Sequence, residues 1–342
     1  MLTRLFLGLI LSAAISYFMT PVARRVAYRV GAIDVPKDQR RIHCEPIPRL
    51  GGLAIYTAFV AASLLLMPMD IPLATLLAGA TMMACMGMVD DTRPLPARLK
   101  LTIQILAALV VIAGGARIEF ITNFLSASKP IIPLGVFSVP ATLFWVVGIT
   151  NTVNLIDGLD GLAAGVAGIA SLSLAAVAYL NGQPEVAVLL AILAGAALGF
   201  LPHNSHPASI FMGDTGSLLI GFVLAVISIE GVIKSATTIA VAIPVLALGV
   251  PIFDTAFAIL RRMVNGRPIM EADKGHLHHR LLEKGFSHRQ TVWILYAFSL
   301  FLGISAIYIS GAGRTTSIAV LLVVTLVLMM AMIRVGLLKR TS

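Results

Sequence analysis

Apolar runs of about 20 residues recur along the chain and alternate with short polar segments. Each run is long enough to cross the roughly 30 Å hydrocarbon layer of a membrane as a helix. The pattern therefore predicts an all-α polytopic membrane protein that forms a single domain over residues 1–342. We expect about eleven spans, at residues 2–20, 50–67, 71–89, 99–114, 133–150, 161–180, 186–202, 217–231, 237–259, 292–309 and 316–334.

The ninth run, "IPVLALGVPIFDTAFAILRR", contains Pro244 and Pro251. Each proline removes a helical hydrogen bond, so we expect this span to be kinked. Asp254 follows within the run, where a carboxylate at membrane depth costs roughly 2.5–3.5 kcal/mol and is a functional candidate. Pairing with Arg261 or Arg262 near the membrane surface explains it equally well.

Composition supports the membrane assignment and narrows the class of protein. Hydrophobic residues make up 58% of the 342 residues and charged residues only 12%, against roughly 25% charged in soluble domains. The first run has its positive charges behind it and lacks an A-x-A cleavage site, so we expect a retained span rather than a signal peptide. Cys44 and Cys85 suggest no disulfide framework.

The net charge of +9 is unevenly distributed, which argues against nucleic acid as a partner and predicts an orientation. Of the Lys and Arg residues, 20 fall in one set of connections and 5 in the other. The positive-inside rule then places the N-terminus outside and the C-terminus in the cytoplasm of a cell (inner or plasma) membrane. The cytoplasmic loops, 21–49, 90–98, 151–160, 203–216 and 260–291, hold nearly all the Asp, Asn and His residues, so we expect the site there.

Loop 151–160 begins the stretch "NTVNLIDGLDGLAAG", in which Asn151, Asn154, Asp157 and Asp160 are each three residues apart. This spacing keeps side chains on one face of a helical turn. Four oxygen-bearing groups there suit a hard cation or a polar ligand. A polar turn with an aspartate as a helix N-cap is the structural alternative.

Loop 203–216 leads into "FMGDTGSLLIG", where Asp214 lies between Gly213 and Gly216. The glycines leave room for a phosphate or a metal near the backbone, and the following helix N-terminus favours anions. Phe211 suits stacking on a nucleobase. A helix cap, with Phe211 anchoring the membrane interface, is the alternative.

Two loops carry clustered basic groups. "EADKGHLHHRLLEKG" holds His276, His278, His279 and Arg280, with Lys274 and Lys284 on either side. Zinc is an alternative here, as is a solvated juxtamembrane helix, but the nearby Lys and Arg favour an anionic substrate. "DVPKDQRRIHCEPIPRLGG" holds His43 and Arg49. Positive-inside charge or anionic lipid explains the basic residues there, whereas His43 and the "PRLGG" turn indicate a ligand.

Asp90 and Asp91 end the third span and are followed by Lys100. Adjacent carboxylates repel, so one keeps a raised pKa or both share a cation. Carboxylates, an asparagine, basic groups and an aromatic ring together form the inventory of phosphoryl transfer. No Walker A motif is present, which argues against an ATPase motor.

In order along the chain, "VDD", "NTVNLIDGLDGLAAG", "FMGDTGSLLIG" and "HLHHRL" resemble the polyprenyl-phosphate N-acetylhexosamine-1-phosphate transferases of glycosyltransferase 4 type. The resemblance covers nearly the whole chain. It implies transfer of a sugar-1-phosphate from a UDP-sugar to undecaprenyl phosphate in the lipid bilayer, with Mg²⁺ (or Mn²⁺ in its place) as cofactor and UMP released. It also implies a homodimer as a candidate assembly.

The resemblance assigns roles to matching positions. Asp90 and Asp91 match the paired aspartates, with Asp90 as the proposed base, and Lys100 matches a lysine that serves the phosphates. Together with the loop patterns, the expected site residues are Asp90, Asp91 and Lys100 for catalysis; Asp214 and Asn154 for the metal; Asn151, Asp157, Asp160, Asn204 and Phe211 for the nucleotide or sugar; and His43, Arg49, His276, His278, His279 and Arg280 for the phosphates.

Two departures from the family pattern matter, one for the basic group after the aspartates and one for the donor sugar. The D-D-x-x-K pattern reads Asp90-Asp91-Thr92-Arg93 here, so a different basic group follows the aspartates. The last loop resembles the branch that transfers N-acetylglucosamine-1-phosphate to start teichoic acid, O-antigen or related glycans. A phospho-N-acetylmuramoyl-pentapeptide transferase is the alternative enzyme, and a secondary transporter is the alternative of another class. A direct attack and a covalent aspartyl intermediate are both compatible with the sequence.

Overall fold

A computed structural model describes residues 1–35, 46–122, 131–233, 241–266 and 275–335. The helices are α1 (Leu2–Val30), α2 (Gly52–Leu66), α3 (Ile71–Thr92), α4 (Ala97–Ala113), α5 (Ser138–Leu155), α6 (Leu162–Leu180), α7 (Pro184–Asn204), α8 (Gly213–Ser228), α9 (Ala242–Ala247), α10 (Gly249–Val264), α11 (Leu277–Glu283), α12 (His288–Ser310) and α13 (Arg314–Val335). Short 3₁₀ and π turns cover Gly135–Phe137 and Ile229–Ile233. Two antiparallel strand pairs complete the described fold: β1 (Ile33–Asp34) with β2 (Ile47–Pro48), and β3 (Phe120–Thr122) with β4 (Ile131–Pro133).

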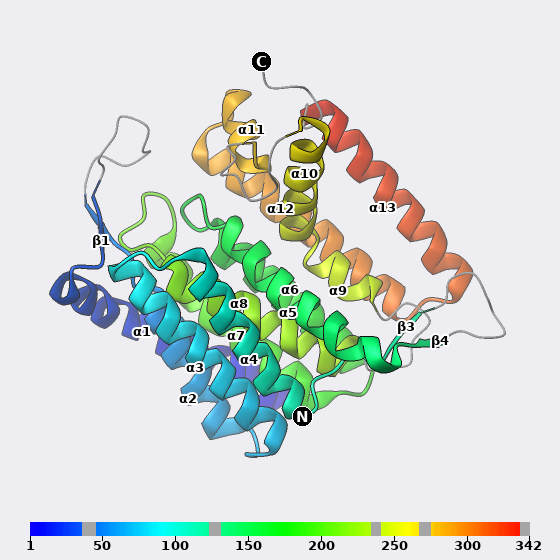
Figure 1. Cartoon of the computed structure of the whole chain (residues 1–342), viewed down its shortest axis with the longest axis horizontal. Coiled ribbons are helices and arrows are strands. Elements are labelled where there is room, and N and C mark those ends of the chain that lie inside the picture. Colours follow the sequence, from blue (N-terminus) through cyan, green and yellow to red (C-terminus); the bar gives the residue numbers. More distant parts are fainter. Residues whose placement is uncertain (36–45, 123–130, 234–240, 267–274, 336–342) are drawn as a thin grey trace.

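The helices form a bundle built around α8 (Figure 1). Every residue of α8 is buried except Asp214, so this helix is apolar all round, as expected for the centre of a bundle. α3 and α5 pack on α8, α1 packs along α7, and α12 packs on α6. α6 and α7 are rich in Ala and Gly, which lets helix backbones approach closely in a membrane.

The prediction of a multi-pass helical membrane protein is confirmed. Every predicted span coincides with a helix or, for the ninth, with the pair α9 and α10. Seven helices among the described residues are long and apolar enough to cross a membrane, and Gly52–Leu66 and Arg314–Met330 are shorter apolar helices. The exact number of eleven crossings and the orientation of the termini stay predictions.

The ninth predicted span is interrupted at Leu248, between its two prolines. The Leu248 N–H closes the last turn of α9 on the carbonyl of Pro244. α10 then starts afresh in another direction (Figure 1), and Pro251 lies in its first turn, where a missing N–H costs no helical hydrogen bond. The expected kink is therefore a complete break between two helices.

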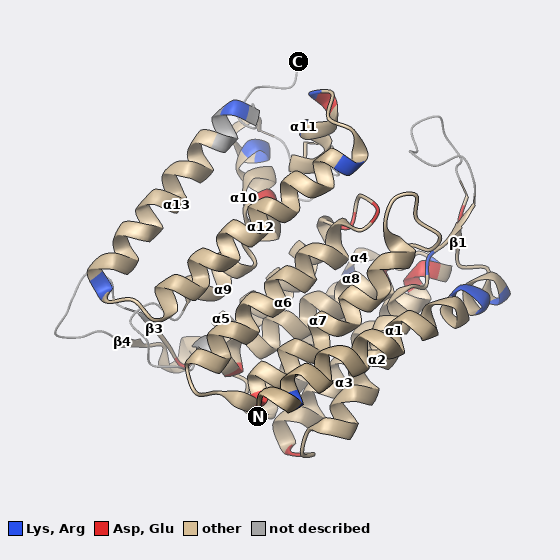
Figure 2. Ribbon diagram, turned by 180° about the vertical axis from the view of Figure 1, so that it is seen from behind, with Lys and Arg blue, Asp and Glu red and all other residues tan. Residues whose placement is uncertain are grey.

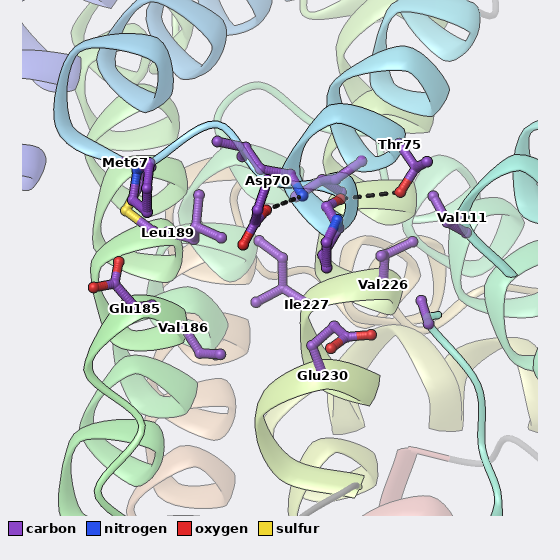
Figure 3. A pocket seen from close by; sticks show the side chains of 15 residues that line it. Met67, Asp70, Thr75, Val111, Glu185, Val186, Leu189, Val226, Ile227 and Glu230 are labelled. Carbon is purple, nitrogen blue, oxygen red and sulfur yellow. Dashed lines mark hydrogen bonds between the residues drawn. The ribbon is translucent and has the colours of Figure 1, made fainter. Parts of the chain in front are cut away.

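Charged residues are concentrated at one end of the bundle. Figure 2 shows Lys and Arg at the C-terminal ends of α1, α10 and α13, in the half of the molecule away from the N-terminus; blue segments also mark Arg314 at the other end of α13 and Arg4 near the N-terminus. At the other end, a cavity of about 200 Å³ lies among α3, α7 and α8 (Figure 3). Asp70 lines this cavity and caps α3 by accepting the Leu73 N–H at 2.8 Å. It is about 30 Å from Asp91 at the other end of the same helix, so this cavity is not part of the candidate site.

α2 and α8 cross in close contact at the charged end of the bundle. A Cβ at Gly52 would overlap the backbone of Gly216, and a Cβ at Gly216 would lie 2.8 Å from the Cα of Gly52. The Gly51 and Gly52 N–H groups donate to the carbonyls of Phe211 and Met212, both at 2.9 Å. The "PRLGG" turn is thereby held against the beginning of α8.

Candidate active site

Asp91 holds the turn at the beginning of α8. Its buried carboxylate accepts the backbone N–H groups of Asp214 at 2.9 Å and Thr215 at 3.0 Å, and the Thr215 hydroxyl at 2.7 Å. Arg49 lies 3.6 Å away on the other side. Gly213 has a φ of 71°, and a Cβ there would overlap both Asp91 and the Arg49 carbonyl, so the position requires glycine. Asp91 thus supplies the acceptors that the first turn of α8 needs.

Asp90 faces a different set of groups. Its Oδ2 lies 2.7 Å from the Lys100 ammonium, and its Oδ1 accepts the Leu95 N–H at 2.7 Å. Lys100 also reaches Asp214 Oδ2 at 3.0 Å, so it joins two carboxylates from separate helices. The predicted catalytic group of Asp90, Asp91 and Lys100 is therefore brought together with Asp214.

Asn154 and Asp157 approach the same group from the end of α5. The Asn154 amide donates to Asp214 Oδ1 at 3.1 Å and to Ser217 Oγ at 2.8 Å. Asp157 follows in the turn after α5. Burial, and then the negative charges of Asp214 and Asp91, raise the pKa of Asp157 to about 7. The acids face excess negative charge, which a divalent cation would neutralise.

The residues of this cluster fit Mg²⁺. Four carboxylates and one amide offer the hard oxygen donors that this ion prefers. Lys100 and Arg49 supply two positive charges near those carboxylates, which leaves the cluster negative when all four are ionised. Asp214 is the aspartate that both Lys100 and Asn154 contact, and it is accessible from the charged end of the bundle.

The four polar residues at three-residue intervals, from Asn151 to Asp160, contact different partners. Asn154 contacts Asp214, and Asp157 is close enough to feel the Asp214 charge, whereas Asn151 exchanges two hydrogen bonds with Gln104, at 2.6 and 3.3 Å. Asp160 faces away and lies 2.8 Å from His206. The periodicity fails because α5 ends at Leu155, so that Asp160 lies beyond the helix.

Asn204 and Phe211 lie where the polar loops join. The buried Asn204 accepts the Gly161 N–H at 3.0 Å and donates to the Ile210 carbonyl at 3.1 Å, so its amide connects the loops before α6 and α8. The Phe211 N–H donates to Pro48 at 2.8 Å, which fixes its backbone against β2. The Phe211 side chain is half-buried. Their assignment to a uridine pocket stays a prediction.

The histidine loop is anchored by Asp254. His276 Nδ1 lies 2.8 Å from Asp254 Oδ2, and the Leu277 N–H donates to Asp254 Oδ1 at 2.6 Å. Both side chains are buried, with 3% of Asp254 and 8% of His276 exposed. Arg261 Nη1 donates to the Gly275 carbonyl at 2.7 Å. Among the described contacts Asp254 pairs with the histidine loop, and its functional role stays a prediction.

This anchored loop extends to the turn that carries Asp157. The rings of His276 and His278 are parallel, with centroids 5.9 Å apart. A Cβ at Gly158 would lie 2.6 Å from His278 Nε2, so the ring packs directly against this turn. Burial, and then His279, lower the pKa of His278 to about 4. It is therefore a neutral ring at physiological pH, and its Nδ1 has no hydrogen-bond partner among the described residues.

Several residues that contact the predicted site residues were not predicted from the sequence. Gln104 lies on α4 four residues after Lys100, on the same helix face, and this spacing within an apolar run was the usable signal. His206 and His288 gave no local signal, because their common partner Asp160 is distant in sequence. His43, by contrast, was predicted but lies outside the described residues.

Comparison with known proteins gives a consistent result. Residues 73–232 match the protein family described as glycosyl transferase family 4. The chain is 38% identical to the probable undecaprenyl-phosphate N-acetylglucosaminyl 1-phosphate transferase of Bacillus subtilis, over 94% of this chain and 89% of the relative. It is 36% identical to the decaprenyl-phosphate N-acetylglucosaminephosphotransferase of Mycolicibacterium smegmatis, over 89% and 80%. Identity to the Escherichia coli K12 undecaprenyl-phosphate alpha-N-acetylglucosaminyl 1-phosphate transferase is 29%, over 83% and 78%.

Proposed function

The chain belongs to glycosyl transferase family 4, and from this premise we propose that it transfers N-acetylglucosamine-1-phosphate from UDP-N-acetylglucosamine to undecaprenyl phosphate. The products are a lipid-linked sugar pyrophosphate and UMP, and the reaction begins a cell-envelope glycan. The names of the Bacillus and Escherichia relatives support this sugar and this lipid in preference to a muramoyl-pentapeptide donor. The mycobacterial relative is named for a decaprenyl acceptor, so the lipid length differs within the family.

The single observation that carries the proposal is the bridge of Lys100 between Asp90 and Asp214. In the reaction, an oxygen of the lipid phosphate forms a bond to the β-phosphorus of the UDP-sugar. The bond from that phosphorus to the bridging oxygen breaks, and its electron pair leaves with UMP. Asp90 accepts the proton of the lipid phosphate or orients its oxygen, and the Lys100 ammonium offsets the charge that develops on the phosphates.

We propose Mg²⁺ as the cofactor, held by Asp214 with Asn154 and with Asp157 nearby. When bound, the ion neutralises the pyrophosphate. Asp91 is then a positioning group, because its carboxylate is occupied by the turn that carries Asp214. His278 and Arg280 are the proposed phosphate-binding residues of the histidine loop, because His278 packs against the Gly158 turn beside Asp157.

We further propose that the site faces the cytoplasm of the cell membrane. The split of Lys and Arg between the two sets of connections supports this side, as does their concentration at one end of the bundle (Figure 2). The homodimer stays a prediction from the family resemblance.

The test uses the purified full-length chain, labelled UDP-N-acetylglucosamine, undecaprenyl phosphate and MgCl₂. We expect lipid-linked product and UMP in equal amounts, and loss of both in Asp214→Ala. Glu185→Gln is the matched control, because this exposed acid pairs with Arg4 at the other end of the bundle. Near-normal turnover by Asp214→Ala would contradict the metal role. Product only from a muramoyl-pentapeptide donor would overturn the sugar, and UMP released without acceptor would indicate a two-step route.

A further inference from the structure

A second cluster of ligand-type side chains lies beside the candidate active site. Asp160 comes from the loop between α5 and α6, His206 from the loop after α7, and His288 from the first turn of α12. One donor atom from each residue lies within 4.8 Å of the other two. His206 Nδ1 is 2.8 Å from Asp160 Oδ2, and the two imidazole centroids are 4.3 Å apart. Three segments that are distant in sequence therefore bring their potential metal-ligating atoms close together.

Two imidazole nitrogens and one carboxylate are a common ligand set for borderline-soft dications such as Zn²⁺. A tetrahedral ion with bonds of about 2.0–2.1 Å holds its ligand atoms roughly 3.4 Å apart. The donors are already close to that spacing, so small side-chain rotations complete the site. Three protein ligands leave the fourth position for water. The all-oxygen group around Asp214 suits Mg²⁺ instead, so the two clusters select different metals.

The carboxylate at the centre of the cluster is held in place by the backbone. The Ala208 N–H donates to Asp160 Oδ2 at 3.2 Å, and the Asp160 N–H faces His288 Nε2 at 3.2 Å. His288 Nδ1 is buried and has no hydrogen-bond partner among the described residues. His288 Nε2 can therefore exchange its hydrogen bond with the Asp160 N–H for a bond to an ion. No other hydrogen bond between this imidazole and the described residues is lost.

We propose that Asp160, His206 and His288 bind a Zn²⁺-class dication that fastens α12 to the loop between α5 and α6. This inference stands on the cluster alone, and it makes Asp160 a metal ligand in place of the nucleotide or sugar contact expected from the sequence. The same loop is already held by Tyr296 of α12, whose hydroxyl donates to the Gly161 carbonyl at 2.5 Å. The ion adds a second fixed point three residues from Asp157, at the edge of the active site.

The first experiment measures metal binding by the purified full-length chain. The protein is stripped with a chelator, supplied with saturating MgCl₂ to fill the oxygen-rich site, and titrated with ZnCl₂ against a chromogenic chelator. We expect one tightly bound Zn²⁺ per chain and at least about a 100-fold loss of affinity in His206→Ala/His288→Ala, since even outer-shell changes at metal sites cost 10–100-fold. His203→Ala is the matched control, because this nearby histidine contacts Tyr17 and lies outside the cluster.

The second experiment needs no variant, so it stands even where the double substitution impairs folding. X-ray absorption at the zinc edge of the wild-type protein should show N/O ligands at about 2.0–2.1 Å with the scattering of two imidazoles. Equal Zn²⁺ uptake by the wild type and the double variant overturns the proposal. A first shell without imidazole, or no uptake by the wild type in the presence of Mg²⁺, overturns it as well.

Discussion

The carboxylate of Asp91 accepts both the backbone N–H and the hydroxyl of Thr215, at 3.0 and 2.7 Å. Its neighbour Asp90 contacts neither group of Thr215 and instead accepts from the Lys100 ammonium and the Leu95 N–H. Consecutive residues on a helix point about 100° apart, so the pair divides between two surroundings. One aspartate maintains the first turn of α8, and the other faces Lys100.

This division predicts that the same Asp→Asn substitution lowers stability at position 91 and turnover at position 90. Asp91→Asn should lower the free energy of unfolding by about 1–3 kcal/mol, because a buried donor in the turn loses its acceptor. Asp90→Asn should leave the melting temperature close to wild type while kcat falls by on the order of 10²-fold. Thermal unfolding and turnover are measured on both variants. The same pattern of loss in the two would contradict separate roles.

Lys100 should support catalysis through its positive charge and through a side chain long enough to contact both Asp90 and Asp214. Lys100→Met keeps the apolar stem but removes the ammonium that joins Asp90 and Asp214, so kcat should fall by on the order of 10²–10³-fold. Lys100→Arg should recover only part of this, because the guanidinium is planar and larger. Arg98→Met on the exposed side of α4 serves as the control. Comparable loss in the control would indicate a general charge effect.

Asp157 predicts a pH dependence of cation binding. Its pKa is raised to about 7 from 3.8, so the carboxyl is largely protonated at pH 6 and ionised at pH 8. A bound Mg²⁺ competes with that proton, and its apparent affinity should rise about tenfold over this interval. In the metal-free protein, the native state retains a proton that the unfolded chain has lost, so stability should fall as pH rises from about 4 to 7.

Mg²⁺ titrations of turnover at pH 6, 7 and 8 measure the first effect, and denaturant unfolding in chelator measures the second. Asp157→Asn should flatten both profiles, because the titrating group is gone. A full pH dependence in the variant would assign the titration to another residue.

Asp254→Asn should loosen the histidine loop without removing a substrate contact. His276 and the beginning of α11 lose a charged acceptor, so KM for the UDP-sugar should rise by about tenfold with a smaller change in kcat. Thr255→Val is the control, because the Thr255 hydroxyl has no partner among the described residues. A fall in kcat with KM unchanged would place Asp254 in the chemical step instead.

Much of the fold can be predicted from the order of apolar and polar residues along the chain. Hydrophobic runs of membrane length predict helices because the bilayer demands that each span satisfies its own backbone hydrogen bonds. Asp90, Lys100, Asn154 and Asp214 could be predicted as a group since each is polar at the end of a span. The break at Leu248 was harder to predict, because two prolines indicate a kink but not whether the helix resumes.

Pairings between distant loops could not be read from the sequence. Asp160 was expected beside Asp157 from its spacing, but the end of α5 turns it toward His206. Asp254 was open to two interpretations because nothing in its own run identifies His276 as its partner. Such contacts depend on how helices pack, and side-chain periodicity within one segment carries no information about that packing.

Gly52 and Gly216 bring the backbones of α2 and α8 into direct contact where the two helices begin. The separation of these helices is therefore set by the radii of main-chain atoms, which substitutions elsewhere do not alter. Lipid-facing side chains of α2 and α3 can accordingly diverge in size while Asp91 and Asp214 keep their spacing. The spacing of these two carboxylates is therefore tied to main-chain contact and not to the size of the side chains on the outer surface.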